Sequence, residues 1–260
     1  MYSARLILFL FMLTPGGAHA GEQLTIAVAS NFQATAKEIA TQFSATTDIS
    51  VRISSGSTGS LYARIVNGAP YDIFLAADTA RPRLLEKHGF AVANSSFVYA
   101  SGQLVLWSAD PRFKGRDCGE DLANGAFTHL AIANPRTAPY GLAAKSYLQS
   151  KKLWISVSDR LVVGENIAQT FQFIATGNAT MGLISASQIS GGVSSKTTCL
   201  DIISEQAIGD IQIHQAGVIL SASQNKPAAE RFMSFLQSSD VAALLAQRGY
   251  RADVDMVERF

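Results

Sequence analysis

The most constraining feature of this sequence is an alternation of strand-like and helix-like segments that occurs twice. Each half of the chain contains three short apolar segments, and all but the last of them are followed by apolar residues at helical spacing. The strand-like segments are 24–29, 49–53 and 73–78 in the first half and 130–134, 161–163 and 181–185 in the second. Such alternation predicts α/β units with largely parallel sheets.

Two longer extended segments, 97–107 and 211–220, lie between these units. A chain that leaves one domain, builds a second and then returns forms two lobes joined by a two-strand hinge. We therefore predict that lobe 1 comprises residues 21–101 plus 219–260, and that lobe 2 comprises residues 102–218. Ligands of open α/β sheets bind in the crevice at the carboxyl ends of the strands, so we expect a site between the lobes.

The first 20 residues have the organisation of a secretory signal peptide. Arg5 is followed by an apolar run at 6–13, and Ala18-His19-Ala20 fits the small-x-small cleavage rule. The apolar run is too short to span a bilayer. Cleavage after Ala20 would leave Gly21 at the new N-terminus, where a lipid anchor would require Cys. We therefore predict a soluble protein exported to the periplasm.

Charge and cysteine content narrow the function further. Without Arg5, the chain carries 20 Lys plus Arg and 20 Asp plus Glu, so it lacks the basic excess typical of a nucleic-acid binder. Cys118 and Cys199 are the two cysteines of a chain that enters an oxidising compartment, and we predict one structural disulfide. No His lies near either cysteine in sequence, so we expect no metal cofactor. We also expect the protein to be a monomer.

Hydroxyl-bearing and amide-bearing residues gather where strands lead into helices. The stretch 53–61 contains four Ser, one Thr and two Gly without any charged residue. Strand, turn and helix in this order form an anion site, because free backbone N–H groups and the positive end of the helix dipole converge there. Related junctions occur at 30–31, 135–141 and 164–167, where Arg136 and Glu165 are the charged exceptions.

Each junction also has a simpler interpretation as an ordinary helix N-terminus. Ser30 or Asn31 is the expected N-cap of the helix that follows. Tyr140 can be explained by packing against the hinge. Glu165 favours a helix N-terminus electrostatically but would repel an anion.

Neutral donors on both lobes suit a small tetrahedral dianion that must be released again. Backbone N–H groups, hydroxyls and an amide donate hydrogen bonds without a counter-charge. The lack of a carboxylate in the junctions argues against a protonated ligand such as hydrogen phosphate, although Asp72 or Asp78 could reach the crevice in three dimensions.

Enzymatic alternatives find little support. The 56–59 segment has neither the pattern of a nucleotide-binding P-loop nor that of a hydrolase nucleophile elbow. A Ser/His/Asp site assembled from distant residues would make the protein a periplasmic enzyme acting on an anion, but no motif points to one. We therefore expect a binding protein and not an enzyme.

Several segments in order resemble the periplasmic molybdate-binding proteins of molybdate ABC importers. They are 29–32, 55–59, 67–78, 133–141 and 164–167, and of these the block from Asn67-Gly68-Ala69-Pro70 to Ala77-Asp78 is the most specific. The resemblance spans nearly the whole mature chain. It implies the two-lobe, type II periplasmic-binding-protein fold, a molybdate or tungstate ligand, a membrane permease as partner and no cofactor. A binder of another oxyanion, sulfate or phosphate, in the same architecture is the alternative.

The same resemblance implies which residues hold the oxyanion. They are Ser30, Asn31, Thr58 (with Ser57 as the competing alignment), Tyr140 and Ile167, the last two through backbone N–H groups. Some members carry a tyrosine where this chain has Ser185, and others carry it in the loop at Tyr140. The fifth contact therefore has two candidates, Ser185 and the Tyr140 hydroxyl.

Overall fold

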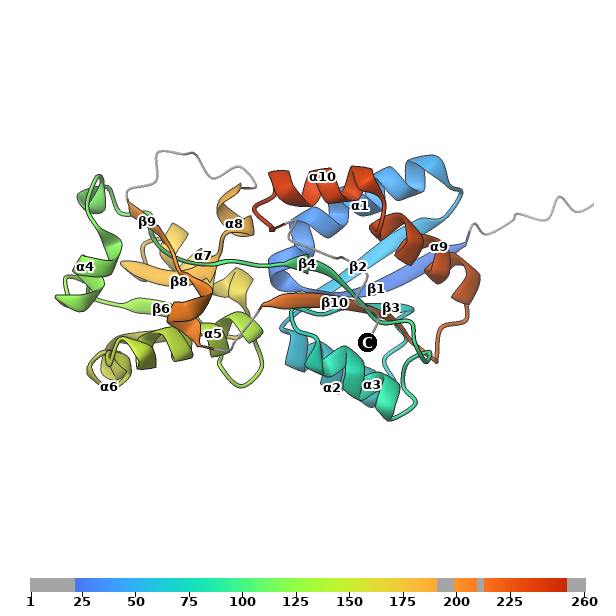
Figure 1. Cartoon of the computed structure of the whole chain (residues 1–260), viewed down its shortest axis with the longest axis horizontal. Helices are drawn as coiled ribbons and strands as arrows, with labels where there is room; N and C mark the ends of the chain where they lie inside the picture. The colour runs from blue at the N-terminus through green and yellow to red at the C-terminus, as the bar shows by residue number, and fades with distance from the viewer. Residues whose placement is uncertain (1–21, 191–198, 210–212, 252–260) are drawn as a thin grey trace, which may run out of the picture.

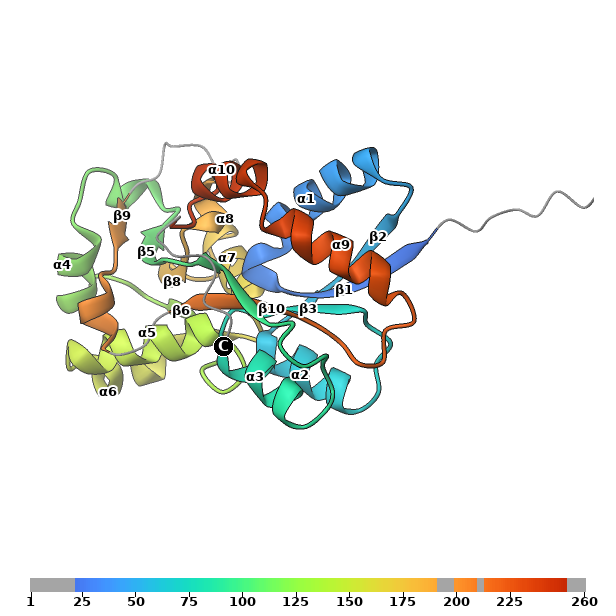
Figure 2. The ribbon, with the colours of Figure 1, turned by 45° about the vertical axis from the view of Figure 1, so that its right-hand side comes forward.

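Two five-stranded sheets, each covered by helices, form two lobes that lie end to end (Figures 1 and 2). The structure is a computed structural model that describes residues 22–190, 199–209 and 213–251. The predicted two-lobe α/β architecture is confirmed. The predicted signal peptide, residues 1–20, lies outside the described residues.

The first lobe has the strand order β2-β1-β3-β10-β4. Its strands are β1 (Gln23–Ala29), β2 (Ser50–Gly56), β3 (Ile73–Leu75), β4 (Phe97–Ser101) and β10 (His214–Ile219). Its helices are η1 (Ser30–Phe32), α1 (Gln33–Thr46), α2 (Thr58–Val66), α3 (Ala80–Lys87), α9 (Lys226–Leu236) and α10 (Ser239–Gln247). Strands β1, β2 and β3 are parallel, and β10 runs antiparallel between β3 and β4.

The second lobe has the strand order β7-β6-β8-β5-β9. Its strands are β5 (Leu104–Ser108), β6 (Leu130–Ala133), β7 (Leu161–Gly164), β8 (Met181–Ser185) and β9 (Cys199–Ile202). Its helices are η2 (Pro111–Phe113), α4 (Cys118–Ala123), α5 (Pro139–Ser150), α6 (Trp154–Val157), η3 (Ser158–Arg160), α7 (Ile167–Ala175), α8 (Ser187–Ser190) and η4 (Glu205–Ile208). Here β6, β7 and β8 are parallel, whereas β5 is antiparallel to β8 and β9.

Alternation along β1 explains why helices cover both faces of the first sheet. Leu24, Ile26 and Val28 pack into one apolar cluster, which contains residues of α1, α9 and α10. Ala27 points to the opposite face and belongs to a second cluster with Leu61 of α2. A parallel strand that is buried on both faces reads as a continuous apolar run, which is the pattern that the sequence shows.

The lobes are connected through two neighbouring strands. The chain passes from β4 directly to β5 through Gly102 and Gln103, as predicted for the first extended segment. Where β10 returns, His214 pairs with Ser101 of β4, and the Gly102 N–H donates to the Ile213 carbonyl at 2.9 Å. Residues 211–212 of the second predicted segment lie outside the described residues.

Strand pairing places β10 entirely in the first sheet. We predicted that lobe 2 extends to residue 218, but β10 begins at His214 and pairs with both β3 and β4. Its pairing, and not its position after the second lobe in the chain, decides to which sheet the strand belongs.

A disulfide joins two elements at the far side of lobe 2. Cys118 at the start of α4 and Cys199 at the start of β9 are bonded, with a Cα–Cα distance of 5.6 Å. This pairing confirms the predicted bridge. In the part of the chain that the structure describes, no helix has the length and apolar character needed to cross a membrane.

Candidate functional site

A small pocket lies where the carboxyl ends of the parallel strands of both sheets face one another. The space between its lining atoms is about 180 Å³, including the part that is open to solvent. Both lobes line it, with Ala29, Ser30, Asn31, Gly56, Ser57, Thr58 and Ala77 from lobe 1 and Ala138, Pro139, Tyr140 and Ile167 from lobe 2. All six residues predicted to hold an oxyanion therefore line one pocket, although they are spread over 138 positions of the chain.

The first junction differs from the predicted helix cap. We expected Ser30 or Asn31 to cap α1, but a 3-10 turn, η1, comes between β1 and α1, so Phe32 is the N-cap and makes no side-chain capping bond. The prediction of a cap was therefore wrong. Ser30 and Asn31 form this turn, where both are buried and line the pocket.

Asn31 is held from two directions. Its Nδ2 donates to Oε1 of Gln215 on β10 at 2.9 Å. Its backbone carbonyl accepts from the Ser187 hydroxyl of lobe 2 at 3.1 Å and from the Tyr250 hydroxyl at 3.0 Å. Gln215 is fully buried, and its Oε1 also accepts from the Tyr99 hydroxyl at 3.2 Å. The sequence analysis did not single out Gln215, although a glutamine within an apolar strand is a signal of a buried hydrogen-bond network.

At the second junction, Ser57 and Thr58 have different roles. Ser57 is the N-cap of α2, and its Oγ accepts from the Ser60 N–H at 3.4 Å and donates to the Ser60 hydroxyl at 2.8 Å. Thr58 is almost fully buried, and its Oγ1 accepts from the Ala77 N–H at 3.1 Å. Among the described residues the Thr58 hydroxyl hydrogen has no protein acceptor, so this hydroxyl is a donor at the pocket wall.

The third junction is a tight loop followed by a helix that begins with proline. The Asn134 side chain accepts from the Arg136 N–H at 3.0 Å, and its carbonyl accepts from the Ala138 N–H at 2.9 Å. Pro139 is the first residue of α5, and Tyr140 follows it. The first N–H groups of a helix have no partner within the helix, which leaves the Tyr140 N–H at the pocket wall.

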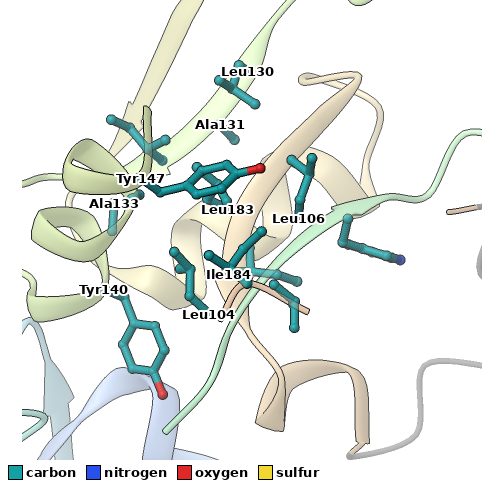
Figure 3. Packing of buried hydrophobic residues seen from close by; sticks show 14 of the residues in the cluster. Leu104, Leu106, Leu130, Ala131, Ala133, Tyr140, Tyr147, Leu183 and Ile184 are labelled. Atoms are coloured by element: carbon teal, nitrogen blue, oxygen red, sulfur yellow. The ribbon is translucent and has the colours of Figure 1, made fainter. Parts of the chain in front are cut away.

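The Tyr140 side chain belongs to the apolar cluster of lobe 2, and its hydroxyl points out of that cluster toward the hinge (Figure 3). Its hydroxyl accepts from the Ser185 hydroxyl at 2.9 Å, and it lies only 2.0 Å from the position that a Cβ on Gly102 would occupy. Burial raises the pKa of Tyr140 well above its usual value, and the neighbouring Tyr250 raises it further, so the phenol stays protonated.

Ser185 itself does not line the pocket. It is fully buried, and its hydroxyl is bonded to those of Tyr140 and Ser187. Both candidates for the fifth contact thus belong to a hydrogen-bonded chain that runs behind the pocket from Tyr140 to Asn31.

At the fourth junction, a side-chain cap leaves one backbone donor unused. Asn166 is the N-cap of α7, and its Oδ1 accepts from the N–H groups of Ala168 and Gln169 at 3.0 and 3.1 Å. Ile167 is the first helical residue, and its N–H does not donate to the Asn166 Oδ1. Among the described residues this N–H has no acceptor, as is usual for the first N–H groups of a helix. The capping role of Asn166 was not part of our predictions.

Among the residues that the structure describes, none with a formal charge lines the pocket. Asp72 accepts from the Thr25 N–H at 2.7 Å and from the Ser223 hydroxyl at 2.6 Å, at the opposite end of β1. Asp78 pairs with Arg81. Glu165 is exposed and does not line the pocket. Neither aspartate therefore brings an acceptor to the crevice.

The arrangement suits one chemical task. Three α-helix N-termini and the 3-10 turn η1, two junctions from each lobe, bring backbone N–H groups and a hydroxyl donor to this small pocket. Helix N-termini favour negative charge, and a wall of donors without a carboxylate matches a fully deprotonated oxyanion. Among the described residues, no group of three His, Cys, Asp or Glu side chains is placed to hold a metal ion.

Comparison with known proteins gives consistent matches over nearly the whole chain. The model of the bacterial extracellular solute-binding protein family matches residues 24–251. The chain is 42% identical to the molybdate-binding protein ModA of Azotobacter vinelandii over 236 residues, which cover 88% of this chain and 89% of that protein. It is 38% identical to ModA of Rhodobacter capsulatus over 238 residues, with coverage of 90% and 89%.

A solved structure agrees with these sequence matches. The structure of the Azotobacter vinelandii periplasmic molybdate-binding protein superposes with a TM-score of 0.83 at 36% identity. The match covers 88% of this chain and 98% of that one, so both lobes are included.

Proposed function

The chain belongs to the bacterial extracellular solute-binding protein family, and on that basis we propose that it captures molybdate between its two lobes and delivers it to the membrane permease of an ABC importer. Tungstate, of nearly the same size and the same charge, is the expected second ligand. The protein acts in the periplasm as a monomer and performs no catalytic step. Relatives named as molybdate-binding proteins support this choice of ligand.

One observation carries the proposal. The pocket between the lobes is lined by helix N-termini from both of them, and no described residue in its lining carries a charge. A dianion held there by neutral donors is stabilised without a counter-ion, and it can leave again when the lobes separate. An enzyme that uses a hydroxyl nucleophile would need a base beside it, and the described residues that line the pocket include hydroxyls but no His, Asp, Glu or Lys.

We assign the donors by their positions in the pocket. Thr58 donates through its hydroxyl, whereas Ser57 mainly caps α2. Tyr140 and Ile167 donate through backbone N–H groups, and Ser30 and Asn31 donate from the turn that follows β1. Lobe closure then brings donors on opposite walls to one ion, so that binding shifts the population toward the closed form.

Calorimetric titration tests the proposal. Purified mature protein is titrated with molybdate, tungstate, sulfate and phosphate at the same pH and ionic strength. We expect tight binding of molybdate and tungstate and much weaker binding of the other two. Tight binding of sulfate or phosphate together with weak binding of molybdate would overturn the assignment in favour of another oxyanion.

A further inference from the structure

The two lobes touch directly at one edge of the pocket. Gly59, the second residue of α2, donates its N–H to the Thr137 carbonyl of lobe 2 at 2.8 Å. Thr137 belongs to the loop before α5, where its own N–H donates to the Asn134 carbonyl at 3.2 Å. A donor on a helix of one lobe thus meets an acceptor on an internally bonded loop of the other.

The contact leaves no room for a side chain at position 59. A Cβ there would lie 2.9 Å from the Thr137 carbonyl oxygen and 3.0 Å from the Thr137 Cα. Both are backbone atoms, which cannot turn aside as a flexible side chain can. Gly59 is not among the residues with a positive φ, so its backbone conformation is open to alanine. The obstacle to a side chain is the opposite lobe.

The residues next to this contact line the pocket. Thr58 precedes Gly59, and Ala138 follows Thr137. A second hydrogen bond between the lobes, from the Ser187 hydroxyl to the Asn31 carbonyl at 3.1 Å, involves another lining residue. Two hydrogen bonds between the lobes therefore border the pocket and help to fix the distance between its walls.

We propose that Gly59 is a specificity-determining residue, because its missing side chain sets how closely the pocket walls approach one another. This inference rests on the proposed function and names what limits the size of the ion. Tetrahedral oxyanions of equal charge differ mainly in radius, so donors on opposite walls can all reach only an ion of matching size. Widening the cleft at Gly59 leaves a bound ion in contact with one wall.

Alanine substitution at Gly59 tests this role. We expect the Gly59→Ala protein to melt within a few degrees of the wild type without ligand, since alanine is a good helix former. Its affinity for molybdate should fall at least tenfold, and the ratio of molybdate to sulfate affinity should fall as well. Gly59→Val should show a larger loss than Gly59→Ala, because the added volume pushes the walls further apart.

Arg81 provides the matched control. Its Nη2 lies 3.1 Å from the position of a Cβ at residue 59, but it ends a flexible side chain. Arg81→Ala should bind molybdate like the wild type, and Gly59→Ala combined with Arg81→Ala should bind as poorly as Gly59→Ala alone. Recovery of affinity in the double variant would overturn the proposal, because a surface side chain and not the opposite lobe would then be the obstacle.

Hydrogen exchange of the wild-type protein tests the same contact without a substitution. The Gly59 amide should exchange more slowly when saturating molybdate is added, since closure buries it against Thr137. Unchanged exchange at Gly59 in a protein that binds molybdate would overturn the proposal, as would a Gly59→Ala protein with wild-type affinity and selectivity.

Wild-type protein that fails to bind molybdate would instead refute the proposed function. Fluorescence energy transfer between the lobes tests the contact without relying on affinity. With saturating molybdate, equal inter-lobe distances in the wild type and in Gly59→Ala would overturn the contact.

Discussion

In the site that we propose, the two lobes present their donors to the pocket by different means. Lobe 1 offers hydroxyl groups, and Thr58 in particular has its oxygen fixed by the Ala77 N–H, so that its hydrogen is left to donate. Lobe 2 offers backbone N–H groups at Tyr140 and Ile167. The Tyr140 hydroxyl is directed to the hinge, and the side chain of Ile167 has no hydrogen-bonding atom.

This difference indicates which substitutions matter in each lobe. In lobe 1, the proposed contact depends on side-chain chemistry, so removing a hydroxyl should remove a donor. In lobe 2, it depends on the backbone of the first helical turn, so most side chains are tolerated and only loss of the N–H itself should matter. The following predictions test this contrast, beginning with the largest expected effect.

Proline at position 167 should remove the lobe 2 donor while it keeps the helix. Ile167 is the first residue of α7, where proline is well tolerated, and Asn166 has the extended backbone that suits a residue before proline, with φ −150° and ψ 172°. We expect Ile167→Pro to weaken molybdate binding by about 2–3 kcal/mol, the upper range for a hydrogen bond to a charged group. Calorimetric titration measures the change.

The control for that experiment is Ile167→Val, which keeps the N–H and the apolar side chain. It should bind molybdate as the wild type does. Equal affinities of all three proteins would mean that the Ile167 N–H does not contact the ion.

Removing the Thr58 hydroxyl tests the side-chain contact of lobe 1. We expect Thr58→Val to weaken molybdate binding by about 1–2 kcal/mol, because the ion loses one donor. The variant should also be less stable, since the buried Ala77 N–H loses its acceptor. Thr58→Ser restores the hydroxyl and should recover most of both losses. Affinity is measured by titration and stability by urea unfolding.

Ser57→Ala separates capping from binding at the same junction. Loss of the N-cap oxygen should lower the free energy of unfolding by about 1 kcal/mol. Molybdate affinity should change less than it does in Thr58→Val. A larger loss of affinity in Ser57→Ala would reverse the roles that we assign to these two residues.

The smallest effect on binding is expected from Tyr140→Phe. The substitution keeps the backbone N–H and removes a hydroxyl that is bonded to Ser185 behind the pocket. We expect molybdate affinity to change by less than about 0.5 kcal/mol, whereas the free energy of unfolding falls by about 1 kcal/mol. A tenfold loss of affinity would show that the hydroxyl supplies the fifth contact.

Alkaline pH adds an independent measurement on the same residue. Burial raises the pKa of Tyr140, so the folded protein keeps this proton at pH values where an unfolded tyrosine, with a pKa of about 10, loses it. Stability should therefore be fully present below pH 10 and should decrease as the pH rises above it. Urea unfolding at pH 8, 10 and 11 should show a smaller decrease in Tyr140→Phe than in the wild type.

Much of the fold was predictable because local patterns agree with the tertiary structure. The three parallel strands of each lobe, the crossing from β4 to β5 and the bond between Cys118 and Cys199 are all as predicted. Two features were not. The turn η1 replaces a side-chain cap at Ser30 and Asn31, and β10 belongs to the first sheet from His214 onward. Both depend on contacts with segments distant in sequence, which periodicity does not report.

The sequence by itself determined which segments form strands and helices and which uncharged junctions carry donors, because apolar spacing and the choice of Ser, Thr, Gly and Pro act within a few residues. Only the tertiary structure decided how those donors are used. It brought four junctions to one pocket, turned the Tyr140 hydroxyl toward the hinge and placed the Gly59 N–H on the Thr137 carbonyl. The physical reason is that the distance between two lobes depends on backbone contacts across the cleft, and no local pattern in the chain encodes that distance.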